Sequence, residues 1–364
     1  MEKYRCPGCA GDMQFDPAAG LLKCPRCGHT QAPPETAATP APDAHPLDEF
    51  LARTGTDHLS ALSQQALQVN CEGCGSVVSF QPPEVAGACP FCGSNIVAQP
   101  QAADPLIAPD GVLPAKVSKT DAQAEVRRWI ESRWFAPGGL KRLARQDSVS
   151  GVYLPFWSYA ADTFSQYTGE RGEPYWETET YTETDDNGNS VERTRQVQRI
   201  AWYPAAGQVS RRFADVLVAA SKAVARNKLE ALEPWDLEKL RAYDPTYLAG
   251  YKAQRYQIEL AAGFDHAKEL MAPTIHGDVC RDIGGAQQRV ISVDTAYQNS
   301  TFRHLLLPVW IGAYRFQNKV FQVVVNARTG EVQGERPYSV GKIALLVVAI
   351  LIVIILLVVL GHHR

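Results

Sequence analysis

The chain has 364 residues, of which 45% are hydrophobic and 21% charged, and this composition excludes bulk disorder and collagen-like structure. Its 36 Lys and Arg residues against 39 Asp and Glu leave a formal charge of −3, which disfavours a protein that follows nucleic-acid phosphates. The first residues are polar, so no signal peptide is expected. Eight of the nine cysteines form Cys-x-x-Cys pairs, a spacing typical of metal sites rather than of secreted disulfide frameworks.

Two N-terminal segments carry one cysteine pattern, repeated at an offset of 65 residues. Each segment has two Cys-x-x-Cys pairs whose inner cysteines are separated by 14 residues. Four thiolates at this spacing can surround a tetrahedral Zn²⁺ and leave no open position, so we predict two structural zinc sites without catalytic function. Iron in a rubredoxin-like site is the alternative. The predicted ligands are Cys6, Cys9, Cys24 and Cys27 in the first site and Cys71, Cys74, Cys89 and Cys92 in the second.

The composition also suggests where domains begin and end. Zinc ribbons are predicted at 1–30 and 70–98. Pro- and Ala-rich stretches connect them to the rest of the chain, and such stretches behave as semi-rigid tethers. They comprise a linker with a short helix at 31–69 and a second linker at 99–113. The ribbons are therefore expected to hang on tethers beside a body at 114–338.

The body has the pattern of a mixed α+β fold. Asn187-Gly188 lies between two alternating segments and predicts a β-hairpin. On its two strands, the carboxylates of Glu173, Glu177, Glu179 and Glu183 are expected to pair with Arg193, Arg195 and Arg199 across the hairpin. The other predicted elements are a helix after Thr120-Asp121, a strand within 149–167, helices at about 214–242 and 263–282, and strands at 287–298, 303–316 and 319–326.

A short motif recurs in the body. Leu154-Pro155-Phe156-Trp157 returns as Leu307-Pro308-Val309-Trp310 at an offset of 153 residues. The recurrence predicts two related α+β halves; chance similarity between two strand starts is the alternative.

The C-terminus is strongly apolar, because residues 343–360 are all Ala, Val, Ile or Leu. At about 1.5 Å per residue this run measures about 27 Å, close to the bilayer core of about 30 Å. The sequence therefore predicts a transmembrane helix at 341–361. It also predicts a tail-anchored, single-pass protein of the inner (cell) membrane whose N-terminal domain is cytoplasmic.

Other candidate sites have simpler explanations. Cys280 and His276 would share a helix face, but no orienting group can be identified, so a structural cysteine is expected. The chain contains no phosphate-binding loop, dinucleotide fingerprint, HExxH or GxSxG motif. We therefore expect no enzyme activity, no catalytic residues and no small-molecule substrate.

The ribbons, the LPFWSY segment, the stretch LPVWIGAYRFQNKVFQVVVNARTGEVQGERPYS and the apolar C-terminus together resemble a known group. This group consists of bacterial tail-anchored double zinc-ribbon membrane proteins, which often carry the label of primosomal helicase or transcription-factor-type zinc ribbons. The resemblance implies that the eight paired cysteines bind metal, and it implies partners of the SPFH type or from the envelope-stress response. Helicase activity is not implied, because the nucleotide-binding loop is absent here.

Two functional hypotheses follow. The first is an adaptor that recruits a protein partner to the membrane, with the C-terminal helix in the lipid bilayer and the ribbons capturing the partner. The second is a membrane-anchored nucleic-acid-binding protein. The first is favoured because the ribbon at 1–30 has a net charge of only +1 and the ribbon at 70–98 of −2, and an acidic ribbon binds phosphates poorly.

Overall fold

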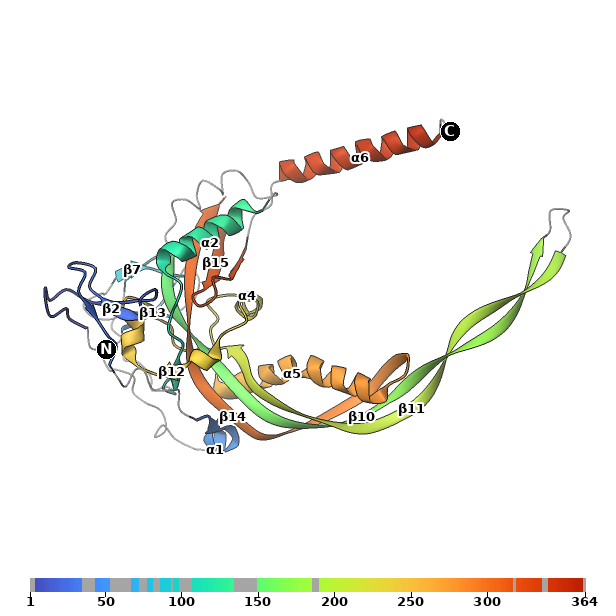
Figure 1. The fold of residues 1–364 in the computed structure, drawn as a ribbon, viewed down its shortest axis with the longest axis horizontal. Helices are drawn as coiled ribbons and strands as arrows, with labels where there is room; N and C mark the ends of the chain where they lie inside the picture. The colour runs from blue at the N-terminus through green and yellow to red at the C-terminus, as the bar shows by residue number, and fades with distance from the viewer. Residues whose placement is uncertain are drawn as a thin grey trace.

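The fold is given by a computed structural model of the chain (Figure 1). It describes residues 4–34, 43–52, 67–71, 77–80, 86–92, 94–97, 107–133, 149–184, 190–316, 319–335 and 340–362.

Three very long strands form the centre of the molecule: β10 (Ser150–Thr184), β11 (Ser190–Ala219) and β14 (Gln287–Phe316). With β15 (Lys319–Asn326) and β16 (Val332–Gly334) they form an antiparallel sheet in the order β11-β10-β14-β15-β16. Four short strands extend the sheet to nine: β4 (His45–Pro46), β9 (Gly111–Val112), β12 (Arg241–Ala242) and β13 (Lys252–Ala253). The long strands curve together into an arm (Figure 1).

Helices cover parts of this sheet. Helix α5 (Leu260–Ile283) lies along the inner side of the curved arm, while α2 (Lys119–Glu131) packs beside β15 (Figure 1). The Ser118 side chain caps α2 by accepting a hydrogen bond from the Asp121 N–H at 3.2 Å. The remaining short helical elements are α1 (Leu47–Ala52), α4 (Arg226–Glu230) and the 3-10 turns η2 (Leu237–Lys239) and η3 (Pro245–Leu248).

The predicted α+β class is wrong, because strands dominate the described residues. Two of the predicted boundaries do not exist. The expected strands at 287–298 and 303–316 are one strand, since Asn299 adopts a φ of 50° at a β-bulge and the pairing with β10 resumes beyond it. Likewise, β11 runs on to Ala219, into the region predicted as helix. The predicted hairpin is confirmed as β10–β11, while its tip at 185–189 lies outside the described residues.

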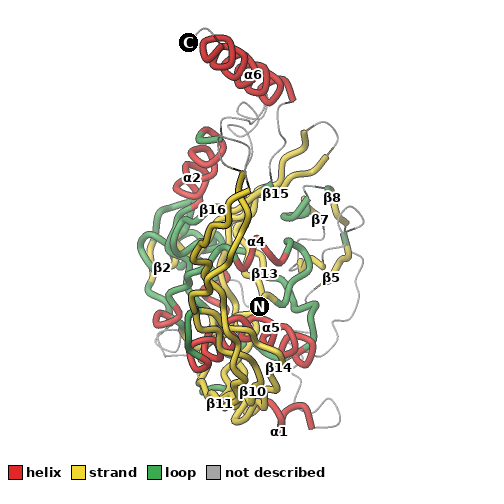
Figure 2. The backbone as a smooth tube through the Cα atoms, turned by 90° about the vertical axis from the view of Figure 1, so that its right-hand side faces the viewer, coloured by secondary structure: helices red, strands yellow, loops and turns green. Residues whose placement is uncertain are grey.

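The predicted tethered ribbons are also wrong, because both ribbons pack on the sheet. The first contains β1 (Gln14–Asp16), β2 (Leu21–Lys23) and β3 (Thr30–Gln31). The second contains the pairs β5 (Leu67–Asn70) with β6 (Val77–Phe80) and β7 (Ala86–Ala88) with β8 (Asn95–Val97). In Figure 2 they lie on opposite sides of the sheet.

The two Leu-Pro-x-Trp motifs meet at the centre of the sheet. Leu154 of β10 is the direct antiparallel partner of Leu307 of β14, so the first residues of the two motifs lie side by side. This part of the β10–β14 pairing is called the seam. Each tryptophan N–H donates to a carbonyl just before a helix: Trp157 to Ile258 at 2.8 Å, before α5, and Trp310 to Val117 at 2.9 Å, before α2. The motif is therefore the joint between two helix-and-hairpin units.

The C-terminal helix α6 (Val340–His362) covers the region predicted to span a membrane. Among the helices of the described residues, however, none is long and apolar enough to cross a membrane. This finding overturns the predicted transmembrane helix at 341–361, the tail anchor and the single-pass inner-membrane location.

Candidate metal centres

The first ribbon brings all four of its predicted ligands together. The sulfur atoms of Cys6, Cys9, Cys24 and Cys27 lie within 4.8 Å of one another, and the Cys6–Cys27 and Cys9–Cys24 pairs are each separated by 3.5 Å. Four sulfurs at about 2.3 Å from one tetrahedral ion would be about 3.8 Å apart. The donor set and its dimensions therefore fit a tetrahedral metal site.

Backbone hydrogen bonds shape both cysteine turns in the same way. The Cys6 N–H donates to the Gly11 carbonyl at 2.8 Å, and the Cys24 N–H donates to the His29 carbonyl at 2.8 Å. The second turn also uses Gly28 at a φ of 77°, a left-handed conformation that favours glycine. These turns aim both sulfurs of each pair at one point.

The second ribbon brings three of its predicted ligands together. The sulfur atoms of Cys71, Cys89 and Cys92 lie within 4.8 Å of one another, with Cys71 and Cys92 3.5 Å apart. The Cys89 N–H donates to the Ser94 carbonyl at 2.8 Å, which is the same five-residue closure as in the first ribbon. The fourth predicted ligand, Cys74, lies outside the described residues. Both ribbons thus contain cysteine clusters that can hold a metal ion.

Hydrogen bonding favours a thiolate at Cys24 of the first cluster, whereas contacts with the Cys6 and Cys9 sulfurs raise the pKa of the Cys27 thiol to about 12. Backbone hydrogen bonds from Cys27 and Arg26 lower the pKa of the Cys24 thiol to about 6, with the Cys27 bond making the larger contribution. A metal ion needs deprotonated cysteine ligands, so an anionic sulfur held by N–H donors matches the chemistry of the site.

The first cluster is continuous with the core of the sheet. Cys6, Cys24 and Phe15 share one buried hydrophobic cluster with Tyr153 of β10 and Leu306 of β14. The Phe15 N–H donates to the Ala249 carbonyl at 2.9 Å, and the Phe15 ring meets the edge of Tyr247 at 5.2 Å. The hairpin face of this ribbon is therefore buried against the body. Its second cysteine turn remains exposed.

The second cluster lies on the opposite face of the same seam. Cys71, Cys89 and Phe91 share a buried cluster with Leu154 and Leu307. Side chains alternate between the two faces of a strand, so Tyr153 and Leu154 belong to different faces. The Gln322 side-chain amide also donates to the Phe91 carbonyl at 2.8 Å. The two cysteine clusters thus cover the joint between the Leu-Pro-x-Trp strands from both sides.

The predicted charge pairs of the hairpin are confirmed. The Arg193 guanidinium lies 2.9 Å from Glu183, Arg195 lies 3.1 Å from Glu179, and Arg199 contacts both Glu177 and Glu179. These pairs are largely exposed and link the two strands of the hairpin. Glu173 instead pairs with Arg171 at 3.3 Å.

Cys280 is less buried than expected for a structural cysteine. It lies on α5 with its sulfur 3.6 Å from Nδ1 of His276, and that histidine is exposed. A different histidine, His304, is not evident as a special residue from the sequence. Its ring is fully buried and makes a 3.0 Å hydrogen bond through Nδ1 to the Ile107 carbonyl, while the sequence around it reads as ordinary strand.

Comparison with known proteins finds a bacterial relative. No family model matches the chain, and no solved structure matches it. A protein of Bacillus subtilis (strain 168) with the name "Uncharacterized protein YdjG" is 27% identical over 347 residues, which cover 94% of this chain and 92% of that protein. The chain is therefore similar to this bacterial protein along nearly its full length.

Proposed function

We propose that this chain is a non-enzymatic adaptor, built on two structural zinc sites, that binds a protein partner through its projecting β-arm. Zinc is the metal we assign because four thiolates with no open position, in small ribbons, are its typical structural site. Cys74 would complete the second set.

The observation that carries the proposal is the distal part of the β10–β11 hairpin. Beyond Gly172 and Gln287, where β14 begins, β10 and β11 are the two strands that continue among the described residues, and the residues on both of their faces are largely exposed. A bare two-stranded ribbon buries little surface and contributes little to stability. It nevertheless exposes large aromatic side chains, with Trp176 66% exposed and Tyr175 44% exposed.

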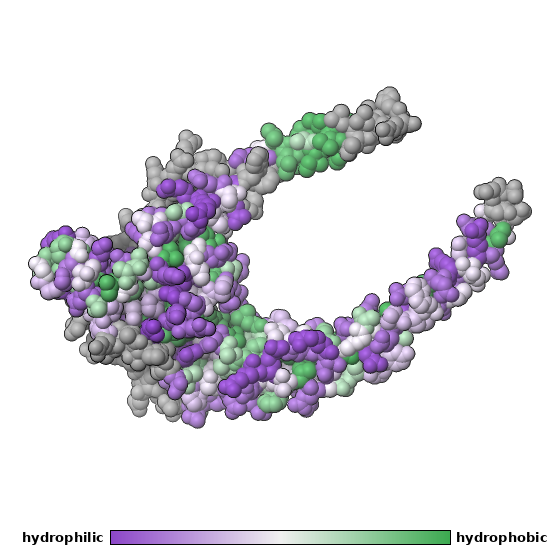
Figure 3. Space-filling view, viewed as in Figure 1, coloured by the Kyte–Doolittle hydropathy of each residue, from purple (hydrophilic) through white to green (hydrophobic). Residues whose placement is uncertain are grey.

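The arm has the surface of a protein contact rather than of a phosphate-binding element. Hydrophilic residues cover most of its surface, with less polar ones between them (Figure 3). The described arm from Glu173 outward has more carboxylates than guanidinium groups. Exposed aromatic residues commonly anchor protein interfaces. The ribbons serve the arm indirectly in this proposal, because their hairpin faces pack on the sheet from which the arm projects.

Metal analysis tests the first part of the proposal. We expect the purified full-length protein to be colourless and to contain two zinc ions per chain by plasma mass spectrometry. Replacing Cys24 with Ser should remove one of them, and replacing Cys71 with Ser should remove the other. A coloured preparation containing iron would contradict the zinc assignment.

Affinity purification in mild detergent with nuclease, followed by mass spectrometry, tests the second part. The W176A/Y181A variant should lose the co-purifying protein, whereas the matched T178A/T182A variant on the same arm should keep it. The family resemblance makes an SPFH-type or envelope-stress protein the partner to look for. Retention of the partner by W176A/Y181A, or recovery only of nucleic acid released by salt, would contradict the adaptor proposal.

A further inference from the structure

Strand β11 forms an open edge of the sheet. Among the strands of the described residues it pairs only with β10, so the backbone groups on its other side have no strand partner there. Such an edge is a template for another strand, and natural proteins usually protect it with charges, bulges or proline.

Protection is present at both ends of β11 and weak in the middle. The distal end carries Arg193, Arg195 and Arg199. The end near the body carries Arg211, Arg212 and a β-bulge at which Asp215 has a φ of 52°. Between them, Ala201–Ser210 contains no charged residue and only one proline, Pro204. This uncharged stretch is named the β11 window here.

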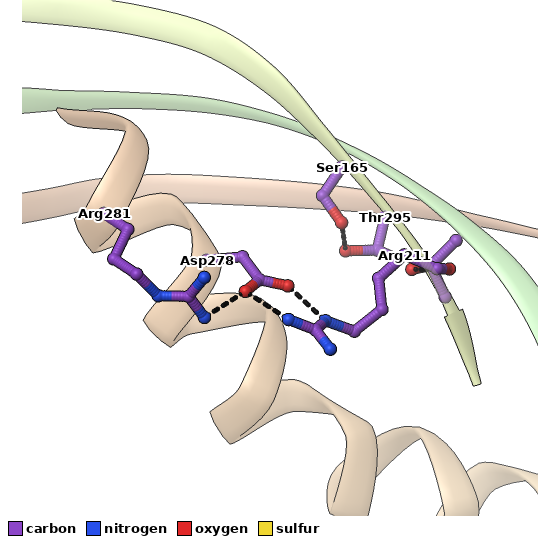
Figure 4. Close-up of polar contacts among 6 residues, drawn as sticks. Ser165, Arg211, Asp278, Arg281 and Thr295 are labelled. Atoms are coloured by element: carbon purple, nitrogen blue, oxygen red, sulfur yellow. Dashed lines mark hydrogen bonds and ion pairs between the residues drawn. The ribbon is translucent and has the colours of Figure 1, made fainter. Parts of the chain in front are cut away.

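The window belongs to a rigid part of the arm. Here β10 and β14 complete a three-stranded sheet, and α5 fastens to it by polar contacts (Figure 4). Asp278 of α5 binds the Arg211 guanidinium and also contacts Arg281. The Tyr167 hydroxyl donates to Asp282 at 2.6 Å. A strand that is already fixed loses little conformational freedom when another strand pairs with it.

We propose that two copies of this chain pair antiparallel along their β11 windows, with a two-fold axis at Gly207. This inference is independent of the proposed function, because it concerns a different part of the arm and needs no metal.

The side chains around Gly207 are complementary under that symmetry. Tyr203 and Arg211 are each four residues from Gly207, and Trp202 and Arg212 are each five residues from it. Pairing about Gly207 therefore places each aromatic side chain of one copy opposite an arginine of the other. Tyr203 is 51% exposed and would lie beside Arg211, whose side chain is 38% exposed and also binds Asp278. The Arg212 side chain is 84% exposed and would lie beside Trp202, whose ring also has the Arg289 guanidinium over it at 3.7 Å.

Pro204 indicates which backbone groups of the window face the open edge. Pro204 has no N–H, and within a sheet such a residue belongs where its nitrogen faces an open edge. Alternate residues share a direction, so Ala206 and Gln208 present their backbone groups outward and would exchange hydrogen bonds with Gln208 and Ala206 of the second copy. Their side chains are exposed, on the face turned away from α5. Apart from Val209, which packs toward α5, the residues between the aromatic and basic pairs are small or polar and leave room for a neighbouring strand.

Charged substitutions at Ala206 and Gln208, which would face each other across the two-fold axis, test the proposal. Full-length protein in mild detergent, which prevents the exposed apolar residues of α6 from associating, is studied by sedimentation velocity over a range of concentrations. The wild type should form a dimer. In A206K/Q208K every Lys faces another Lys across the axis, and the dimer should dissociate at least about tenfold more readily. In A206K/Q208E each Lys faces a Glu, and dimer affinity should return toward the wild type.

Both double variants place two charged residues at the same exposed positions, so folding and solubility are matched, and circular dichroism verifies this. T180K/T182K, on the distal arm, should leave the dimer unchanged. A monomeric wild type would overturn the proposal, as would a dimer that withstands A206K/Q208K. Loss of the dimer in both A206K/Q208K and A206K/Q208E would also overturn it, since the self-pairing register requires that only one of them be repulsive.

Discussion

The two halves of the sheet share a construction but differ in what they support. The first half consists of α2, β10 and β11, and the second of α5, β14 and β15. In each half, the residue that follows the second strand of the hairpin donates its N–H to the proline carbonyl of the motif on the first strand. The Ala220 N–H donates to the Pro155 carbonyl at 2.9 Å, and the Ala327 N–H donates to the Pro308 carbonyl at 3.1 Å. Each motif tryptophan then holds the segment that leads into the helix of the other half. Neither half is therefore complete without its counterpart.

The two halves differ in the residue that each motif tryptophan faces on the neighbouring strand. Trp157 faces His304 across the strands, with the ring centroids 4.8 Å apart, whereas Trp310 faces Gly151. Trp157 is completely buried with α5, and Trp310 remains 7% exposed. The first half also continues into the projecting arm, and the longer helix, α5, covers part of it. One Leu-Pro-x-Trp motif therefore serves both a compact hairpin and the base of an arm when its surroundings differ.

The largest expected effect comes from removing the tryptophans. Truncation of a buried Trp to Ala costs about 3–5 kcal/mol of unfolding free energy. We expect Trp157→Ala to reach the upper part of that range, because it also leaves the Ile258 carbonyl without its donor, and Trp310→Ala to cost less. Urea denaturation followed by circular dichroism measures both. Equal losses would show that the two joints are energetically equivalent.

His304 gives the next largest effect, as a dependence on pH. Burial lowers the pKa of His304 from 6.5 to about 4. Between pH 4 and pH 6.5 the imidazole of His304 is therefore protonated in the unfolded state and neutral in the folded state. The stabilisation from the neutral ring is fully present above pH 6.5 and is lost as the pH falls toward 4, about 3 kcal/mol in all.

Unfolding free energies measured between pH 4 and 7 test this dependence. His304→Asn should flatten the curve, whatever its effect at pH 7. His276→Asn, at an exposed histidine of α5, should leave the slope unchanged. An unchanged slope in His304→Asn would mean that other groups cause the acid sensitivity.

A smaller loss is expected at the glycine opposite Trp310. A Cβ atom on Gly151 would overlap the Tyr251 ring and lie 3.1 Å from the Trp310 ring. Overpacking of this kind costs about 1–3 kcal/mol, so Gly151→Ala should lower the thermal midpoint. Gly277→Ala, whose Cβ would meet no other atom within 4 Å, is the control and should not lower it.

The smallest effect belongs to the arm. Arg195 and Arg199 hold the pKa of the Glu179 carboxyl below its usual value, Arg195 contributing most. This ion pair is exposed, and exposed pairs contribute little to stability. Glu179→Gln should therefore leave the urea midpoint unchanged within error. A clear loss would mean that the arm contributes to the folded core.

Sequence alone determined the features that depend on local spacing. The Cys-x-x-Cys pairs predict the cysteine clusters because each turn needs only a few consecutive residues, and Asn187-Gly188 between alternating strands predicts the β10–β11 hairpin with its Glu179–Arg195 pair. The recurring motif also pointed to the seam, since both copies read as strands of the same kind.

Only the tertiary structure decided where these pieces lie. The Pro- and Ala-rich linkers read as tethers, yet Phe15 and Phe91 find apolar partners on opposite faces of the seam, and burial of those rings holds both ribbons in place. The bulge at Asn299 that joins two strands into one, the buried His304 and the open edge of β11 follow from pairings between residues far apart in the chain. Local sequence patterns do not specify such pairings, because the stability of a strand depends on the residues that pack against it and not on the strand alone.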